Sequence, residues 1–103
     1  MSRDHRWSIR KNVGMDVTLH STQTHSVRGR LINASLEGML IQPDQSCFAK
    51  DTDLEVSFTM PGKNESHHRV RAHVVHNGIH GIGLMLKHMC HTDIHAMQQL
   101  VRP

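Results

Sequence analysis

Apolar side chains recur at every second position along most of the chain. The clearest case covers residues 54–60, where the apolar positions are Leu54, Val56, Phe58 and Met60. Five further apolar-rich segments follow this pattern in full or in part: residues 13–20, 27–32, 38–42, 67–77 and 79–87. A repeat of two residues is typical of a strand with one buried face. The pattern therefore predicts about six strands.

Turn-forming residues separate these segments. Asn33-Ala34-Ser35 has the composition of a loop, and Pro61-Gly62-Lys63-Asn64 is typical of a tight turn. Asn77-Gly78 is a strong hairpin signal, because both residues tolerate positive φ. We expect residues 67–77 and 79–87 to pair as an antiparallel hairpin around it.

The repeat changes near the end of the chain. Apolar residues now recur at helical spacing, at Ile94, Met97, Leu100 and Val101. Thr92 is a suitable N-cap, so the expected helix covers residues 92–102. Residues 1–12 carry several basic side chains and few apolar ones, which indicates a flexible N-terminal arm.

Together these elements predict a mainly β fold. It consists of a small antiparallel β-barrel of about six strands over residues 13–87, a C-terminal α-helix and the arm. Many short strands in so few residues favour a small barrel or a sandwich, because closure removes exposed strand edges, and we expect the barrel. With 103 residues and no linker-like stretch, we expect a single domain over residues 1–103.

Composition and charge narrow the class of protein. No apolar run approaches the roughly 18 residues of a membrane-spanning helix, and the N-terminal segment lacks the apolar stretch of a signal peptide. The two cysteines, Cys47 and Cys90, form no CxxC motif, which fits the reducing cytoplasm. The formal net charge is +3 with the eleven histidines neutral, which favours an anionic partner.

Two short motifs stand out against this background. Arg6-Trp7-Ser8-Ile9-Arg10 in the arm has the spacing R-x-x-x-R, and Asn33-Ala34-Ser35-Leu36-Glu37-Gly38 has the pattern N-x-S-x-x-G. Each motif alone is weak. In this order, followed by a small barrel and a strand with Gly81-Ile82-Gly83-Leu84, they resemble the PilZ domain family over nearly the whole chain. The resemblance implies a receptor for the bacterial second messenger cyclic di-GMP.

The resemblance also implies which residues contact the ligand: Arg6, Arg10, Asn33, Ser35 and Gly38. Cyclic di-GMP is a dianion with two guanines. A guanidinium donates two parallel hydrogen bonds to guanine O6 and N7, stacks on the base and pairs with phosphate. By resemblance, Arg6 and Arg10 hold guanine and phosphate, and Asn33 and Ser35 bond polar edges of the ligand. Gly38 allows a turn and a close approach of the backbone to the ligand.

Some points stay open at this stage. The family pattern allows Asp or Asn at the position of Asn33, and we expect the neutral amide to bind more weakly than a carboxylate. Ordinary turn chemistry is an alternative explanation of the second motif, and solvated charge is one for the arginine pair. Stacking on a base and anchoring the arm on the barrel are two alternatives for Trp7, and we favour the anchor. One ligand or a stacked pair per site are both compatible with the motifs.

Other chemistry finds little support. The chain has no nucleophile elbow, no P-loop and no paired carboxylates at an expected cleft, so we expect no enzymatic activity and no cofactor. Several zinc-type ligands are close in sequence, namely His88, Cys90, His91 and His95. Their spacing is not that of a structural zinc motif, and we expect no metal site.

Two alternative functions are carried forward. A small basic barrel can bind single-stranded nucleic acid, with a basic stripe formed by Arg28, Arg30, Arg69 and Arg71. One Trp, two Phe and no Tyr argue against it, because bases need aromatic platforms. A PilZ-like module that binds only proteins is the other alternative, and the presence of both motifs argues against it.

The resemblance further implies how the signal is passed on. Ligand binding is expected to order the arm and to act through an unidentified partner protein in motility, exopolysaccharide, biofilm or virulence pathways. A monomer and a ligand-dependent dimer both fit, and we expect no membrane insertion.

Overall fold

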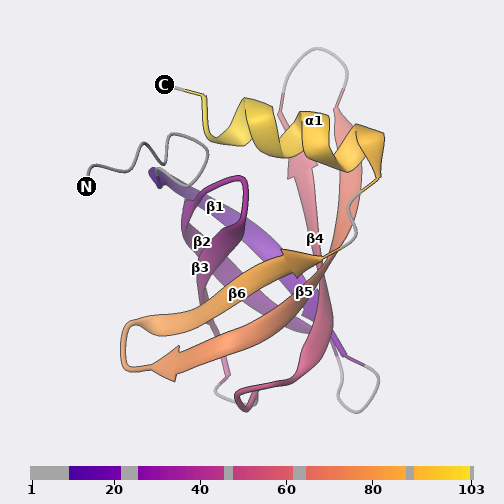
Figure 1. The fold of residues 1–103 in the computed structure, drawn as a ribbon. Coiled ribbons are helices and arrows are strands. Elements are labelled where there is room, and N and C mark those ends of the chain that lie inside the picture. Colours follow the sequence, from indigo (N-terminus) through magenta and orange to yellow (C-terminus); the bar gives the residue numbers. More distant parts are fainter. Residues whose placement is uncertain (1–9, 22–25, 46–47, 62–64, 88–89, 103) are drawn as a thin grey trace, which may run out of the picture.

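Six strands form a closed antiparallel barrel, and one helix follows them (Figure 1). The computed structural model describes residues 10–21, 26–45, 48–61, 65–87 and 90–102. The elements are β1 (Lys11–His20), β2 (Val27–Ala34), β3 (Gly38–Pro43), β4 (Asp53–Met60), β5 (Ser66–Gly78), β6 (Gly81–Lys87) and α1 (His91–Leu100). Their order around the barrel is β1-β2-β3-β6-β5-β4. The predicted fold class is confirmed.

The core lies inside the barrel and is built from the alternating positions of every strand. Leu19, Leu31, Ile41, Val56 and Val74 are completely buried. Burial of one such side chain contributes about 1.5–3 kcal/mol. Met39 and Met97 are also completely buried, so flexible methionines fill space in a core that is poor in aromatic residues.

Two strands are longer than their sequence pattern indicates. β1 begins at Lys11, and Lys11 and Asn12 pair with Ala34 and Asn33 of β2. Residues 11–12 therefore belong to the barrel and not to the arm, and the loop predicted at residues 33–35 is strand as far as Ala34. Ala34 is completely buried. Pairing with β1 and β3 on both sides outweighs the weak strand preference of Asn and Ala.

The hairpin between β5 and β6 is confirmed, but its turn lies two residues later than predicted. Gly78 pairs with Gly81, so Ile79 and His80 form the turn. An irregularity between Val74 and His76 shifts the register of β5. Gly81 has a φ of +128°, a conformation that glycine adopts without strain, and it opens β6.

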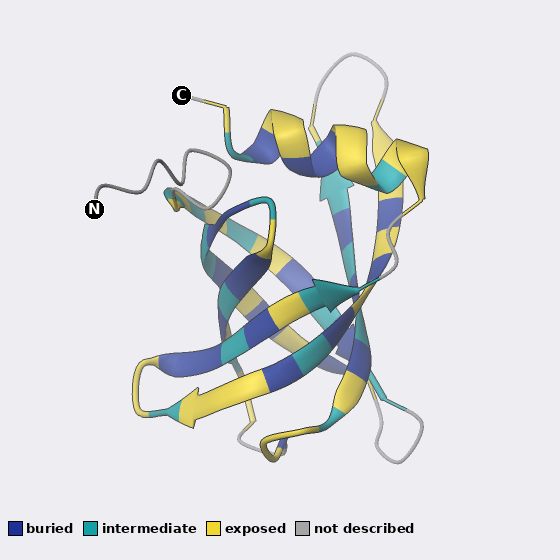
Figure 2. Cartoon of the chain, viewed as in Figure 1, coloured by how far each residue is buried: buried dark blue, intermediate teal, exposed yellow. Residues whose placement is uncertain are grey.

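The helix α1 begins one residue earlier than expected and ends at Leu100. Its N-cap is Cys90 and not Thr92. Ala96, Met97 and Leu100 are buried, whereas Ile94 is 39% exposed, so the buried face is rotated away from Ile94 (Figure 2). The contact with the barrel determines which face of the helix is buried. The spacing of apolar residues along the sequence does not contain this information. No helix in the described ranges is long and apolar enough to cross a membrane.

A polar contact holds α1 on the barrel, across the end seen at the top of Figure 1. Nδ1 of His68 on β5 lies 3.4 Å from Oδ1 of Asp93 in the first turn of α1. The His68 ring stacks on Phe58 at a centroid distance of 5.4 Å, and its Nε2 lies 2.9 Å from the Ser66 hydroxyl. His68 is 8% exposed. The buried imidazole is thus bonded at both nitrogens, as a buried polar ring requires.

Candidate functional site

The two motifs predicted to bind ligand lie at neighbouring strand ends. Arg10 directly precedes β1, and Asn33 lies near the end of β2. Because β1 and β2 are antiparallel, the start of one lies beside the end of the other. Asn33 pairs with Asn12 on β1 and with Leu40 on β3. The structure therefore brings together segments that are 23 residues apart in sequence.

Arg10 contacts the second motif directly. Its Nη1 donates a hydrogen bond of 2.9 Å to Oδ1 of Asn33. Its Nη2 lies 3.7 Å from the position that a Cβ on Gly38 would occupy, so the guanidinium lies between the Asn33 side chain and the turn. Arg10 is exposed, which leaves the group accessible to a ligand. Arg6 and Trp7 lie outside the described residues.

Ser35 shapes the turn between β2 and β3. Its side-chain Oγ accepts hydrogen bonds from the backbone N–H groups of Glu37 and Gly38, both at 3.2 Å. Its own N–H donates to the carbonyl oxygen of Gly38 at 2.9 Å. The residue is only 2% exposed. The hydroxyl thus lies within the turn, and its hydrogen-bond donors there are backbone amides.

Gly38 is required by the packing of β3 on β6. A Cβ at this position would lie 2.4 Å from the carbonyl oxygen of Leu84, a distance that real Cβ atoms do not reach. The N–H of Leu86 donates to the carbonyl oxygen of Glu37 at 2.8 Å and fixes the turn to β6. The close approach visible at Gly38 is therefore to the neighbouring strand.

Lys11, the residue after Arg10, forms a long-range contact that the motif pattern did not indicate. Its Nζ donates to the backbone carbonyl oxygen of Arg102, 91 residues away in sequence. The contact places the carboxyl end of α1 next to the start of β1. No sequence signal indicates such a long-range contact. With Arg10 charged and Asn33 neutral, the site suits an anion.

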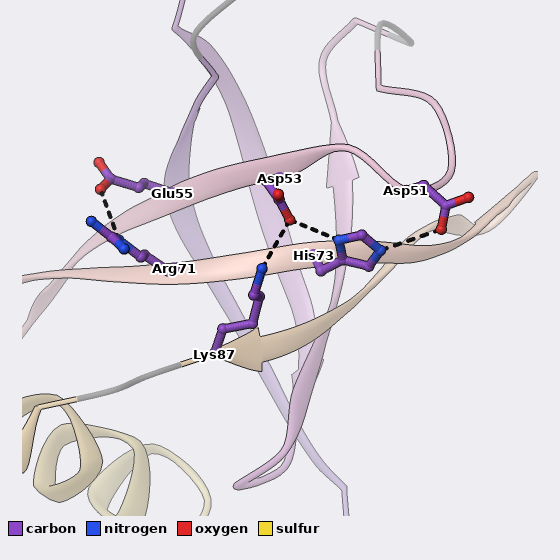
Figure 3. A network of polar contacts seen from close by, with 6 residues as sticks. All are labelled: Asp51, Asp53, Glu55, Arg71, His73 and Lys87. Atoms are coloured by element: carbon purple, nitrogen blue, oxygen red, sulfur yellow. Dashed lines mark hydrogen bonds and ion pairs between the residues drawn. The ribbon is translucent and has the colours of Figure 1, made fainter.

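A second polar network lies on the outer surface of β4, β5 and β6 (Figure 3). The Nδ1 of His73 lies 2.7 Å from Asp53 Oδ1, and its Nε2 lies 3.3 Å from Asp51 Oδ1. Lys87 Nζ donates to the same oxygen of Asp53 at 3.2 Å. Carboxylates only accept, so both ring nitrogens are satisfied when the imidazole is protonated.

The network shifts two pKa values in opposite directions. The hydrogen bond to Asp53, followed by that to Asp51, raises the pKa of His73 above its ordinary value. The hydrogen bond from His73, followed by that from Lys87, lowers the pKa of Asp53 below its ordinary value. Opposite charges favour each other's ionised form. The network therefore favours the protonated form of His73 and the ionised form of Asp53.

The histidines and cysteines provide no metal site in the part of the chain that the structure describes. No group of three His, Cys, Asp or Glu side chains there is arranged to hold a metal ion. Cys90 is exposed, and its Sγ donates to Asp93 Oδ2 at 3.2 Å. Cys47 and His88 lie outside the described residues.

Comparisons with known proteins show the family and the fold of the chain. No curated protein matches the chain. A solved structure with a similar fold is titled the crystal structure of PilZ domain of CeSA from cellulose synthesizing bacterium. The similarity has a TM-score of 0.73 at 14% identity and covers 91% of this chain and 95% of that one, and at this identity it shows the fold. The family model described as PilZ domain matches residues 3–102. The chain therefore belongs to the PilZ domain family, a family of cyclic di-GMP receptors.

Proposed function

We propose that this chain is a receptor that binds cyclic di-GMP at the surface formed by Arg10, Asn33 and the turn of residues 35–38, with Arg6 completing the site. The observation that carries the proposal is the 2.9 Å hydrogen bond from Arg10 Nη1 to Asn33 Oδ1. It joins the two motifs of the PilZ pattern in one place.

Arg10 is the main recognition group in this proposal. A guanidinium has five N–H donors, and the bond to Asn33 uses one of them. The remaining donors and the planar face are available for guanine O6 and N7 or for phosphate. Asn33 keeps a second lone pair on Oδ1 and two N–H donors for a base edge.

The neutral amide of Asn33 has an electrostatic consequence. An Asp here would form an ion pair with Arg10 and neutralise it. Asn33 leaves the guanidinium charge uncompensated. A dianionic ligand therefore meets a net positive site. This compensates in part for the weaker acceptor strength of the amide.

Ser35 and Gly38 support the site through the backbone. Ser35 holds the two amides of the turn, and Gly38 lets β3 approach β6 closely. Their proposed role is to fix the position of the turn beneath the Arg10 guanidinium and to orient Asn33. This is a positioning role in addition to any hydrogen bond that the Ser35 hydroxyl donates to the ligand.

We further propose that bound ligand holds the segment before Arg10 against this face and so presents a new surface to a partner protein. The carboxyl end of α1 adjoins the site through Lys11, so it belongs to the surface that changes. Such a relay serves motility, exopolysaccharide, biofilm or virulence functions in a bacterial cytoplasm. A ligand-dependent dimer is one form that the relay can take.

Isothermal titration calorimetry with cyclic di-GMP tests the proposal, with GTP and cyclic GMP as control ligands. We expect saturable binding of cyclic di-GMP alone. Arg10→Ala should cost about 2–5 kcal/mol of binding free energy, because it removes a charged contact that the ligand desolvates. Arg28→Ala is the matched control, since Arg28 is an exposed arginine of β2 at a distance from Asn33 in the register.

The outcomes separate the alternatives. Tight binding that Arg10→Ala leaves unchanged would contradict the assigned site. No heat with any of the three ligands would favour a module that contacts only proteins. The stoichiometry distinguishes one ligand from a stacked pair.

A further inference from the structure

The barrel is closed between β1 and β4 by a short pairing that covers only part of each strand. These strands pair only at Thr18–Ser57, Leu19–Val56 and His20–Glu55. The preceding residues of β1, 11–17, have no strand partner on this side within the described residues, and neither do residues 58–60 of β4. Figure 1 shows the two strands close together at one end and diverging toward α1. Each strand thus presents an unpaired backbone edge.

A bulge lies in the part of β1 that diverges from β4. The pairing of β1 with β2 changes register between Asn12 and Met15, and Gly14 has a φ of +68°. The Nη2 of Arg30 donates to the carbonyl oxygen of Gly14 at 3.2 Å and supports the bulge. A bulge bends its strand and increases the local twist, which turns the start of β1 away from β4.

The gap between the strands is a groove with an apolar floor. Its volume is about 1210 Å³, and its floor includes Val13, Met15, Phe58, Met60 and Leu100. Val13, Met15 and Met60 are partly exposed. Gln99 and Leu100 of α1 close the groove at one end. A groove with an apolar floor beside a free strand edge suits an extended chain with an apolar residue at every second position.

The rim of the groove is basic on both sides. A row of paired residues marks the end of the groove where β1 and β4 still pair: Arg28 of β2, Thr18 of β1, Ser57 of β4 and Arg69 of β5. Arg30 lies two residues after Arg28 on β2, and His67 lies two residues before Arg69 on β5. Both line the groove. Asp16 and Asp44 are the acidic residues of the lining.

The arginines of the rim are available to a partner. Arg30 contacts Asp16 at 3.3 Å, and Arg69 contacts Glu55 at 3.0 Å. The side chains of Arg30 and Arg69 are 58% and 56% exposed, and such surface ion pairs contribute little and exchange readily. Arg28 is exposed and forms no ion pair among the described residues.

We propose that this groove binds an extended acidic segment of a partner protein, which adds as a strand along the free edge of β1. The unpaired N–H and C=O groups of residues 13–17 bond the backbone of the segment. Its alternate side chains meet the apolar floor, and its acidic side chains meet Arg28, Arg30 and Arg69.

A single-stranded nucleic acid fits the groove less well. Sequence-independent binding of single strands relies on exposed aromatic side chains that stack on the bases. The aromatic ring in the lining apart from histidine is Phe58, which is 4% exposed. The unpaired N–H and C=O groups along the free strand edges, in contrast, are spaced to pair with the backbone of an extended peptide. The proposal stands independently of ligand binding, because neither Arg10 nor Asn33 lines the groove.

Fluorescence anisotropy of the full chain with a labelled octapeptide of alternating Val and Glu tests the proposal. We expect saturable binding that weakens as salt concentration rises. Arg28→Glu and Arg69→Glu should each weaken binding about tenfold. Arg71→Glu is the matched control, since Arg71 is an exposed arginine of β5 outside the groove lining, and it should have a smaller effect.

Two further probes separate strand addition from charge attraction alone. A peptide with proline in place of each valine keeps the charge but presents a backbone without those N–H donors, and we expect it not to bind. Amide hydrogen exchange of residues 13–17 should slow when the Val-Glu peptide binds.

Three results would overturn the proposal. One is an absence of binding by the Val-Glu peptide, with or without binding of an oligothymidine of equal length. The second is equal binding of the proline peptide. The third is peptide binding that leaves hydrogen exchange at residues 13–17 unchanged.

Discussion

At the scale of single residues, the N-x-S-x-x-G segment acts through the backbone. Ser35 uses its hydroxyl oxygen to accept two backbone N–H groups, and Gly38 leaves room for the Leu84 carbonyl. Only Asn33 contacts Arg10 through its side chain. Recognition and support are thus divided among residues of one short motif.

Gly38→Ala should destabilise the protein. The added Cβ would lie 2.4 Å from a backbone oxygen, so β3 or β6 has to shift, at a cost of about 1–3 kcal/mol. Urea unfolding monitored by circular dichroism measures the change. Gly83→Ala is the control in the neighbouring strand, where the new Cβ would meet the His76 side chain at 3.3 Å. A cost no larger than that of the control would contradict the packing argument.

Ser35→Ala should weaken both stability and ligand binding. The substitution leaves two backbone N–H groups of a largely buried turn without their acceptor, which costs about 1–3 kcal/mol. Calorimetry with cyclic di-GMP, at a temperature where the variant is folded, measures the effect on binding. If Ser35 acts only in the turn, Ser35→Asp, which keeps an acceptor, should recover part of the lost stability.

At the scale of elements, α1 is held by its contacts and not by its cap. Cys90 occupies the N-cap position but forms no side-chain hydrogen bond to the first-turn amides. Asp93 in the first turn instead pairs with His68 on β5. The buried residues Ala96, Met97 and Leu100 complete the docking. Tertiary contacts therefore determine where this short helix lies.

Cys90→Ser should stabilise the protein by about 0.5–1 kcal/mol. A serine hydroxyl accepts a hydrogen bond from a first-turn amide, and it can keep the donor role toward Asp93 that the thiol has now. Thermal unfolding under reducing conditions measures the gain. Cys90→Ala lacks the hydroxyl, so an equal rise in Tm in that variant would point away from capping.

At the scale of the whole molecule, charged residues connect strands across the outer surface. Asp53 on β4, His73 on β5 and Lys87 on β6 form one chain of contacts, joined by Asp51 before β4 (Figure 3). All of these groups reach solvent, so the network modulates stability and does not determine the fold.

The contribution of this network should depend on pH in a defined window. The raised pKa of His73 means that its contribution is complete below the ordinary histidine pKa and is lost as pH rises through the raised value. The lowered pKa of Asp53 means that its contribution is present above the ordinary aspartate pKa and is lost as pH falls through the lowered value. The network is therefore fully effective between about pH 4 and pH 6.5.

Urea unfolding of the wild type and of His73→Gln across this range measures the effect. The difference in free energy of unfolding should be largest near pH 6 and should shrink at alkaline pH. A titration of His73 by NMR should place its pKa above that of an exposed histidine, and Asp53→Asn should lower it. A difference between wild type and His73→Gln that is the same at pH 6 and pH 9 would contradict the assignment.

Much of the fold and part of the site follow from local patterns. Alternation in β4 and the apolar positions of β1 predict both strands, since a buried face imposes a period of two. Element boundaries were less predictable. Asn33 and Ala34 lie in β2 because β1 and β3 pair with them. The turn predicted at Asn77-Gly78 lies at residues 79–80, beyond a register shift in β5. The contact of Lys11 with the Arg102 carbonyl, beyond the end of α1, joins distant parts of the chain, and no local signal indicates it.

The barrel class, the strand number and the PilZ resemblance could be predicted from local patterns, because they depend on hydrophobic period, turn composition and motif spacing. Tertiary structure alone decided that Arg10 meets Asn33, that Gly38 faces the Leu84 carbonyl and that β1 separates from β4 to leave a groove. These features depend on strand order, register and a bulge at Gly14. Strand order and register are properties of the closed sheet as a whole, so no single segment of the chain specifies them.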